Sequence, residues 1–205
     1  MSETGSRVAA DALEIVPAES VDDATLIAAF GTAGDPVTCY CQYFKRRGAA
    51  WTQGRPEEFR ADLCADAERA RVASVPGPGL VALRDGDPVG WVAVEPRTSY
   101  ARLLASAVGK ASREAADDAS VWAVTCFVIP REHRRQGLAT ALLEAAISHA
   151  RSRGARVLEG YPVDTRGGRV PSANLYHGPL SVFERLGFVE VARPNEDRAV
   201  VALEL

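Results

Sequence analysis

Apolar and polar residues alternate along this chain with two different periods. In some segments the apolar residues recur every three or four positions, which is typical of an amphipathic helix. These helical segments are residues 20–31, 55–72, 138–154 and 179–187. In other segments apolar and β-branched residues form short runs bounded by turn-forming residues, which favours strands. These strand segments are residues 12–17, 79–97, 120–130, 155–163, 188–193 and 198–205.

Particular residues mark where several of these elements begin and end. Pro56 is suited to the first turn of a helix, and Gly154 is suited to the residue that follows the end of one. Asp85 and Gly86 predict a tight turn that divides residues 79–97 into a β-hairpin. These residues locate the ends of helices and strands without reference to the spacing of the apolar residues.

The remaining segments are less regular. A further helical region is expected from about Val37 through the sequence CYCQYFKRR, and residues 98–119 are expected to form a long, partly helical connector. The run 120–130 is apolar throughout, which indicates a strand buried on both faces. Residues 164–178 are expected to be a loop. The order of elements predicts one mixed α/β domain, of the α+β kind, over residues 11–205 after a flexible tail at 1–10.

Composition narrows the class of protein. The chain has 205 residues, 47% of them hydrophobic, and a formal net charge of −3, which argues against a general nucleic-acid binder. There is no run of 18 apolar residues, so we expect no membrane span and no membrane partner. The N-terminus lacks the basic and then apolar layout of a secretory signal, which favours a cytoplasmic location.

The cysteines and histidines do not suggest a metal site. Four cysteines and three histidines are present, and only Cys39 and Cys41 are close in sequence. A zinc site prefers C-x2-C spacing with a second pair of ligands. We therefore expect free thiols and no metal.

Residues 133–143, HRRQGLATALL, place a basic, glycine-bearing loop directly before a predicted helix. The first turn of a helix presents unpaired N–H groups and the positive end of the helix dipole, which favour an anion such as phosphate. Two common phosphate loops are excluded, because the chain has neither G-x-x-x-x-G-K-[ST] nor G-x-G-x-x-G after its first strand.

The loop residues suggest particular contacts to a pyrophosphate. Gly137 lacks a Cβ and allows the backbone to approach the ligand closely. The arginines add long-range attraction, unless they are simply a solvated pair. The expected binding residues are Arg134 and Arg135 through their charges, and Gln136, Gly137, Ala139 and Thr140 through their backbone N–H groups.

The same stretch resembles the acyl-CoA loop of the GNAT N-acetyltransferase superfamily. That loop has the pattern [QR]-x-x-G-x-[GA] after a strand ending in V-x-P, and here RRQGLA at 134–139 follows VIP at 128–130. The later sequence FERLGFVEV, at 183–191, matches the family's short helix, its GF pair and the strand that follows. The resemblance covers residues 79–205 well and 12–78 loosely. It implies the GNAT fold, a mixed central sheet of about six to seven strands with a splayed strand pair and helices on both faces.

The resemblance also implies a co-substrate and roles for the strand before the loop. Acetyl-CoA would be the acyl donor, with Phe127 and Val128 along its pantetheine arm. The N–H of Val128 would polarise the thioester carbonyl, and a bulge is a plausible way to free that N–H from the strand ladder. Cys126, on the same strand, is either near the acyl group or an ordinary core residue.

The proton donor is where this chain departs from the family. In many members a tyrosine in Y-x-x-x-G-F protonates the departing CoA thiolate, and here that position is Phe183. Tyr176 is the candidate replacement, unless it only packs at the entrance to the following helix. Ser181 and His177 are further candidates.

Acetyl transfer requires a neutral amine as the nucleophile. A lysine-type amine has a pKa of about 10.4 in water, so a base or a desolvating pocket is needed. Glu159, inside the predicted strand VLEGY, is the leading candidate for the base or for an anchor of the amine. Glu95 and Asp164 are alternatives. Each of the three could instead be a solvated or structural carboxylate.

The acceptor is expected to lie near the sequence CYCQYFKRRGAAW, whose aromatic residues would line or cover its site. Lys45, Arg46 and Arg47 would contact an anionic group of the acceptor or the CoA 3′-phosphate, or cap a helix.

The sequence thus predicts an N-acetyltransferase that transfers the acetyl group of acetyl-CoA to a primary amine of a small molecule or peptide. The amine would attack the thioester directly in a ternary complex. The alternative is a catalytically weak acyl-CoA-binding regulatory module, which Phe183 motivates. A homodimer is left open.

Overall fold

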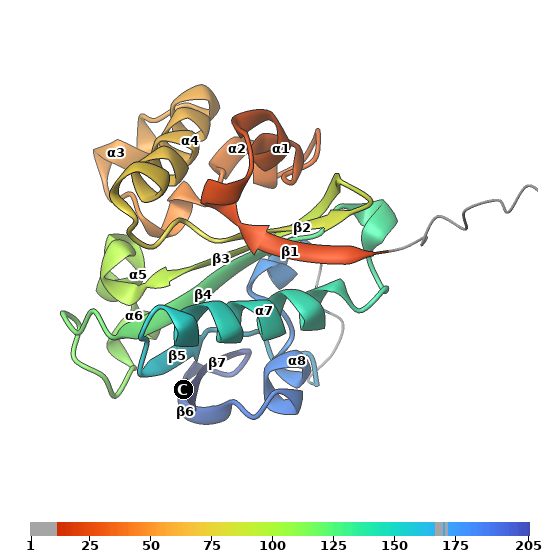
Figure 1. Cartoon of the computed structure of the whole chain (residues 1–205). Coiled ribbons are helices and arrows are strands. Elements are labelled where there is room, and N and C mark those ends of the chain that lie inside the picture. The colour runs from red at the N-terminus through yellow and green to blue at the C-terminus, as the bar shows by residue number, and fades with distance from the viewer. Residues whose placement is uncertain (1–11, 167–169, 171) are drawn as a thin grey trace, which may run out of the picture.

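A computed structural model describes residues 12–166, 170 and 172–205, and the predicted tail at 1–10 lies outside the described residues. The chain forms a seven-stranded sheet in the order β1-β2-β3-β4-β5-β7-β6 (Figure 1). The strands are β1 Leu13–Pro17, β2 Leu80–Arg84, β3 Asp87–Pro96, β4 Val121–Val128, β5 Val157–Gly160, β6 Val189–Asn195 and β7 Arg198–Glu204. Neighbouring strands are antiparallel, except that β4 and β5 are parallel. The predicted mixed sheet is confirmed.

Helices cover both faces of this sheet, as predicted. They are α1 Asp23–Ala28, α2 Pro36–Cys39, α3 Ala49–Thr52, α4 Pro56–Ala73, α5 Ala101–Ala105, α6 Ala107–Lys110, α7 Leu138–Ser152 and α8 Leu180–Arg185. One apolar cluster joins α7 and α8 to the sheet, and a second joins α1 and α4 to its other face. Figure 1 shows α7 and the group α1 to α4 on opposite sides of the strands. No helix in the described ranges is both long and apolar enough to cross a bilayer.

Strand β3 shows how one run of residues supplies both cores. Trp91 and Ala93 belong to the cluster with α1 and α4, whereas Val92 and Val94 belong to the cluster with α7. Side chains alternate between the faces of a strand, so an almost continuous apolar run fills two layers at once. All eight residues of β4 are likewise buried, as the apolar run 120–130 predicted.

Local chemistry accounts for several element ends. Asp22 caps α1 by accepting a hydrogen bond from the N–H of Thr25 at 2.7 Å. Asp85 and Gly86 both have positive φ, 52° and 89°, which is the backbone of a two-residue type I′ hairpin turn. The β2–β3 hairpin is therefore confirmed at the predicted turn.

The helix predicted from Val37 through CYCQYFKRR is wrong as a continuous element. Helix α2 ends at Cys39, and Tyr40 and Cys41 take left-handed φ values of 42° and 56° before a 3₁₀ turn begins. This double turn lets Tyr40 pack against Phe30, with ring centroids 5.3 Å apart. Burial of these side chains against the sheet prevails over local helix propensity.

The parallel pair β4–β5 is short, and this is the feature that positions the site. The two strands pair only along Val121–Val124 and Val157–Gly160, so β5 is shorter than the predicted 155–163. Strand β4 continues to Val128, and in the described part of the chain β3 is its partner there without a second strand. The register with β3 shifts between Ala93 and Val94, which leaves Thr125 as the extra residue of a bulge. The splayed strand pair is therefore confirmed.

Candidate functional site

A cleft of about 880 Å³ opens where β4 and β5 separate. One wall is the end of β4 with the loop that follows it, and the others come from the segment before α4 and from the short 3₁₀ helix η5, Ser172–His177. Of the predicted site residues, Phe127, Val128, Arg134, Ala139 and Tyr176 line this cleft. The end of β4, the loop and the proposed proton donor therefore share one cavity.

The loop before α7 is shaped by its own side chains. The Nε of Arg134 donates to the carbonyl of Ile129 at 2.8 Å. The amide of Gln136 donates to the carbonyl of Glu132 at 3.1 Å, and its oxygen accepts from Arg84 at 2.6 Å. Arg134 and Gln136 thus contribute to loop geometry, whatever else they bind.

The start of α7 has the conformation expected of an anion site. Gly137 is the residue before the first turn and has φ +79°, a region that glycine occupies without strain. Arg135 also has a positive φ, of 63°. The N–H of Thr140 donates to the Gly137 carbonyl at 3.0 Å. Within the described part of the chain, the N–H groups from Gln136 to Ala139 have no hydrogen-bond acceptor.

Tyr176 lies at the cleft and His177 lies behind it. The two rings are 4.4 Å apart, and His177 is also 5.1 Å from Phe44. Burial holds the pKa of His177 well below its usual value, so its imidazole is neutral at pH 7. Burial also raises the pKa of the Tyr176 phenol, which keeps it protonated and able to donate a proton.

The side chain of Phe183 lies in a purely apolar environment. It is fully buried, with ring centroids 6.1 Å from Phe127 and 5.1 Å from Phe188. A Cβ added at Gly160 would lie 2.2 Å from its ring, so the backbone of β5 is in direct contact with this side chain. Phe183 therefore contributes to the core beside the cleft and offers no proton to it.

Three thiols lie along the cleft. Cys39, Cys41 and Cys126 all line it, and all four cysteines of the chain are free. The indole N–H of Trp91 donates to the sulfur of Cys41 at 3.3 Å. The neighbouring Cys126 thiol and burial raise the pKa of Cys41, and burial raises that of Cys39 to about 12. The thiols of Cys39 and Cys41 are therefore protonated and poor nucleophiles at neutral pH.

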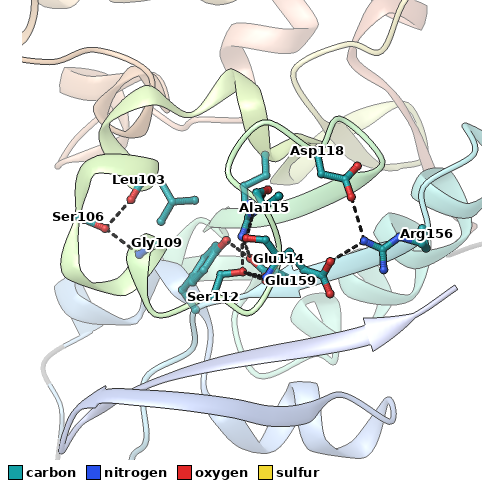
Figure 2. A network of polar contacts seen from close by, with 11 residues as sticks. Leu103, Ser106, Gly109, Ser112, Glu114, Ala115, Asp118, Arg156 and Glu159 are labelled. Atoms are coloured by element: carbon teal, nitrogen blue, oxygen red, sulfur yellow. Dashed lines mark hydrogen bonds and ion pairs between the residues drawn. The ribbon is translucent and has the colours of Figure 1, made fainter.

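Glu159 is not among the residues that line the cleft. It is fully buried and forms an ion pair with Arg97, at 2.9 Å. Its carboxylate also accepts hydrogen bonds from Ser112 at 2.5 Å and from Tyr161 at 2.8 Å, and Figure 2 shows the contact with Ser112. Arg97 in turn donates to the carbonyls of Glu114 and Ala115. The carboxylate is thus fully engaged in a structural network.

The two alternative bases are engaged as well. Glu95 is buried beside Lys45, at 2.6 Å, and burial raises the pKa of its carboxyl. Asp164 accepts hydrogen bonds from Arg166, which lower its pKa, and is also paired with Arg193. Neither side chain lines the cleft.

The basic residues of the segment CYCQYFKRR are directed to other partners. Lys45 lies between Glu95 and Asp66, at 2.6 and 2.7 Å, and Arg46 is paired with Asp62. Arg47 is exposed. Of the aromatic residues in CYCQYFKRRGAAW, which were expected to line the acceptor site, Tyr43, Phe44 and Trp51 line the cleft and Tyr40 does not.

Some residues of the site were not anticipated from the sequence. The turn Gly31–Asp35 lines the cleft, and its sequence, GTAGD, carried only a turn signal. Arg97 was also missed, because its partner Glu159 lies 62 residues away in the chain. Among the described residues, no three His, Cys, Asp or Glu side chains gather in a way that would hold a metal ion.

Comparison with known proteins shows the family and the fold. The model of the acetyltransferase (GNAT) family matches residues 41–178. The structure is similar to yncA from Salmonella typhimurium, solved with its cofactor acetyl-CoA, with a TM-score of 0.53 and 16% identity over 95% of this chain and 94% of that one. It is also similar to the PaiA N-acetyltransferase from Thermoplasma acidophilum, solved with coenzyme A, with a TM-score of 0.52 and 13% identity over 95% and 99%. No curated protein sequence matches the chain.

Proposed function

Because the chain belongs to the GNAT acetyltransferase family, we propose that it transfers the acetyl group of acetyl-CoA to a primary amine of a small molecule or peptide. The observation that carries this proposal is the single cleft that joins the free end of β4, the loop before α7 and Tyr176. A thioester held along β4 would meet an acceptor that enters from the other side of the same cleft.

The acyl donor is assigned to the end of β4 and the start of α7. The free N–H groups from Gln136 to Ala139 and the positive end of the α7 dipole would bind the pyrophosphate, with Arg134 and Arg135 adding attraction. Phe127 and Val128 would lie along the pantetheine arm, because among the described residues β4 has no strand partner there on its second edge. Thr140 would contribute its side chain, since its N–H already has an acceptor.

The reaction is direct transfer in a ternary complex. Acetyl-CoA supplies a thioester carbonyl carbon, to which the neutral amine adds, so that a C–N bond forms and the C–S bond breaks. The N–H of Val128 would stabilise the negative charge on the carbonyl oxygen, an effect worth about 3 kcal/mol for a well-aimed donor. Tyr176 would give its proton to the leaving thiolate, and water in the open cleft would take the proton that the amine loses.

Glu159 as the base stays a prediction, and the proposed mechanism does not use it. Its carboxylate already accepts three hydrogen bonds within the buried Arg97 network.

The first experiment is calorimetric titration of the protein with acetyl-CoA and with dephospho-CoA. Micromolar binding of acetyl-CoA is expected, followed by amine-dependent release of CoA thiol in a panel of primary amines. If acetyl-CoA does not bind, the loop assignment fails. If it binds and no amine releases thiol above background hydrolysis, the proposed activity fails.

Two matched variants test the loop. Gly137→Asp places a carboxylate at the start of α7 and should abolish acetyl-CoA binding by repulsion. Gly154→Asp is the control, because Gly154 has nearly the same φ, +81° against +79°, and neither glycine has an atom within 4 Å of an added Cβ. Both variants carry the same backbone strain, so equal affinities for acetyl-CoA would contradict the proposed phosphate site.

A third variant tests the proton donor. Tyr176→Phe removes only the hydroxyl and should lower kcat by about 100-fold with little change in acetyl-CoA affinity, which is the size of effect typical of a positioned general acid. An unchanged kcat would show that Tyr176 only packs at the cleft and does not donate the proton.

A catalytically weak acyl-CoA-binding regulatory module is the second candidate. Phe183, buried against Gly160, leaves the expected position of the family's acid without a hydroxyl. This function would give tight CoA binding without turnover for any amine, and a stable protein partner in pull-down experiments.

We also propose that the protein acts in the cytoplasm, where four free cysteines would persist in reduced form. We propose no nucleic-acid or membrane partner. Gel filtration at micromolar concentration tests whether the protein is a homodimer.

A further inference from the structure

Two cysteine side chains meet in the wall of the cleft, and the proposed mechanism uses neither of them. Cys41 and Cys126 both line the cavity and are 5% and 7% exposed. They come from distant parts of the chain, namely the turn after α2 and the free end of β4. Two thiols that the fold brings together beside an open cavity can react with each other, which a lone buried cysteine cannot do.

The sheet places the Cys126 side chain beside Trp91. In the register of β3 with β4, Cys126 is opposite Ala93 and Val128 is opposite Trp91. These four residues belong to one apolar cluster, so their side chains share one face of the sheet. Residues directly opposite each other have Cβ atoms about 5 Å apart. The Cys126 sulfur therefore lies on the face that carries the Trp91 indole.

The Cys41 sulfur lies on the same face. It accepts a hydrogen bond from the indole N–H of Trp91 at 3.3 Å, and Cys41 belongs to the same apolar cluster. Its thiol is in hydrogen-bonding contact with the thiol of Cys126, and this contact is the largest cause of the raised pKa of Cys41. The two sulfurs are therefore neighbours in the cleft wall, and the Trp91 indole holds one of them in position.

The backbone that carries Cys41 is strained. Tyr40 and Cys41 both have left-handed φ values, 42° and 56°. Residues other than glycine adopt this region at a cost, and such strain is concentrated at functional sites. Here it directs the Cys41 side chain from the end of α2 onto the sheet, where it meets Cys126.

We propose that Cys41 and Cys126 form a reversible disulfide when the protein meets a hydroperoxide, and that this bond distorts the reacting end of the cleft. In the first step a sulfur attacks the peroxide, so that an S–O bond forms, the O–O bond breaks and one water leaves. In the second step the other sulfur attacks the sulfenic sulfur, so that the S–S bond forms and a second water leaves. The two sulfurs together lose two electrons to the peroxide, and both thiol protons leave in the waters.

Contact between the two sulfurs favours the second step. A protonated Cys41 attacks peroxide slowly at neutral pH, because the thiolate is the reactive form. Once one sulfur has become a sulfenic acid, the other is already beside it, and such an intramolecular reaction has a high effective concentration. The pair therefore reaches the disulfide before the sulfenic acid is oxidised further.

The disulfide would alter the place where the thioester is expected to react. A disulfide holds its sulfurs about 2 Å apart, which is closer than any nonbonded contact, so the turn at Tyr40–Cys41 and the end of β4 are drawn together. Val128, whose N–H is assigned to the carbonyl oxygen, follows Cys126 on the same strand. A displacement of about 1 Å at a reacting group lowers a rate by up to about 100-fold. This effect on turnover rests on the proposed function, whereas the disulfide does not.

Mass spectrometry of the whole chain tests the bond. The protein is treated with excess hydrogen peroxide, denatured, and alkylated with iodoacetamide. Two of its four cysteines should escape alkylation, with a loss of about 2 Da, and dithiothreitol should restore both thiols. A protein in which all four cysteines are alkylated, or in which two become sulfonic acids, would overturn the proposal.

A peptide map identifies the linked cysteines. Trypsin should yield peptides 8–45 and 114–131 joined by a bond that dithiothreitol cleaves. Chymotrypsin cleaves after Tyr40 and so separates Cys39 from Cys41, which shows which of the two is linked. A link through any other pair of cysteines would contradict the assignment.

Matched cysteine variants provide the control. Cys41→Ala and Cys126→Ala each remove one of the two sulfurs and should abolish the link. Cys64→Ala should form it as the parent does, because Cys64 lies on α4 and is not among the residues that line the cleft. Loss of the link in Cys64→Ala would contradict the pairing. If a variant fails to fold, the peptide map of the parent protein still decides.

Turnover of the oxidised protein tests the effect on the cleft. Its kcat with acetyl-CoA and an amine that the reduced protein acetylates is expected to fall by at least about 10-fold, and to return with dithiothreitol. Peroxide-treated Cys126→Ala should keep the rate that it has before treatment. A linked protein with full activity would overturn the distortion of the cleft. If the reduced protein acetylates no amine, the proposed function fails and the peptide map still decides on the disulfide.

Discussion

Replacement of Glu159 by glutamine should destabilise the protein severely, although it changes only one oxygen to an amide. Both partners of the Glu159–Arg97 pair have side chains only 1% exposed. The carboxylate accepts from Arg97, Ser112 and Tyr161, all of them donors. Glutamine would present an N–H₂ to this set of donors and leave the buried guanidinium without a counter-charge.

The size of the loss follows from the burial of the pair. Breaking a buried ion pair by removing one partner costs about 3–5 kcal/mol, because the remaining charge is uncompensated. For a chain of this length 1 kcal/mol lowers Tm by roughly 2–4 °C, so Glu159→Gln should lower Tm by about 6–20 °C. Urea denaturation followed by far-UV circular dichroism measures the change in the free energy of unfolding.

A matched control lies in the same network. Glu114 is paired with Arg156, which is 53% exposed, and Figure 2 shows this pair beside Ser112 and Glu159. The change Glu114→Gln should cost less than about 1 kcal/mol, since exposed pairs contribute little. A double variant, Arg97→Met with Glu159→Met, should be more stable than Glu159→Gln because no charge is left unpaired.

Turnover then decides between a structural and a catalytic role for Glu159. The structural role predicts that the folded fraction of Glu159→Gln acetylates amines at nearly the parent rate. If Glu159→Gln is as stable as Glu114→Gln and yet loses its kcat, the reasoning from the buried network is refuted and Glu159 is the base.

Three further predictions concern packing and pH. Gly160→Ala should cost about 1–3 kcal/mol in urea denaturation, because its Cβ would lie 2.2 Å from Phe183; stability equal to the parent would refute this packing. Gly109→Ala should cost a similar amount, since its Cβ would lie 2.0 Å from a backbone carbonyl, and an unchanged urea midpoint would contradict that contact. Burial lowers the pKa of His149 to about 4 from 6.5, so the unfolded chain takes up the proton first and stability falls as pH drops from about 6.5 to 4. The urea midpoint of His149→Gln should fall less between pH 7 and pH 4.5 than that of the parent, and an equal fall would contradict the assignment.

Much of the fold could be predicted because its signals are local. The apolar run of β4, the turn at Asp85 and Gly86, and the helix that begins at Pro56 each follow from a few neighbouring residues. The glycine loop at 133–143 likewise follows from its own sequence, with Gly137 at φ +79° directly before α7.

The rest depends on partners that are distant in the chain. The left-handed residues Tyr40 and Cys41 follow from burial against Phe30 and Trp91, which no local pattern reports. The sequence predicts a catalytic role for Glu159, and no local pattern reports its ion-pair partner Arg97, which lies 62 residues away. A buried carboxylate has the same appearance in a sequence whether it serves structure or catalysis, so only the placement of its neighbours separates the two.

The short β4–β5 pairing has a consequence for the order in which the chain folds. The hairpins β2–β3 and β6–β7 close small loops and lie on opposite sides of the β4–β5 pair, which we call the seam. The seam itself is parallel and needs the crossover through α7, and non-local contacts of this kind form slowly. We expect the two halves to take shape separately and to dock at the seam last. The cleft beside the free end of β4 is complete only after the two halves have docked. Acetyl-CoA would therefore bind and stabilise the completed structure rather than a partly folded chain.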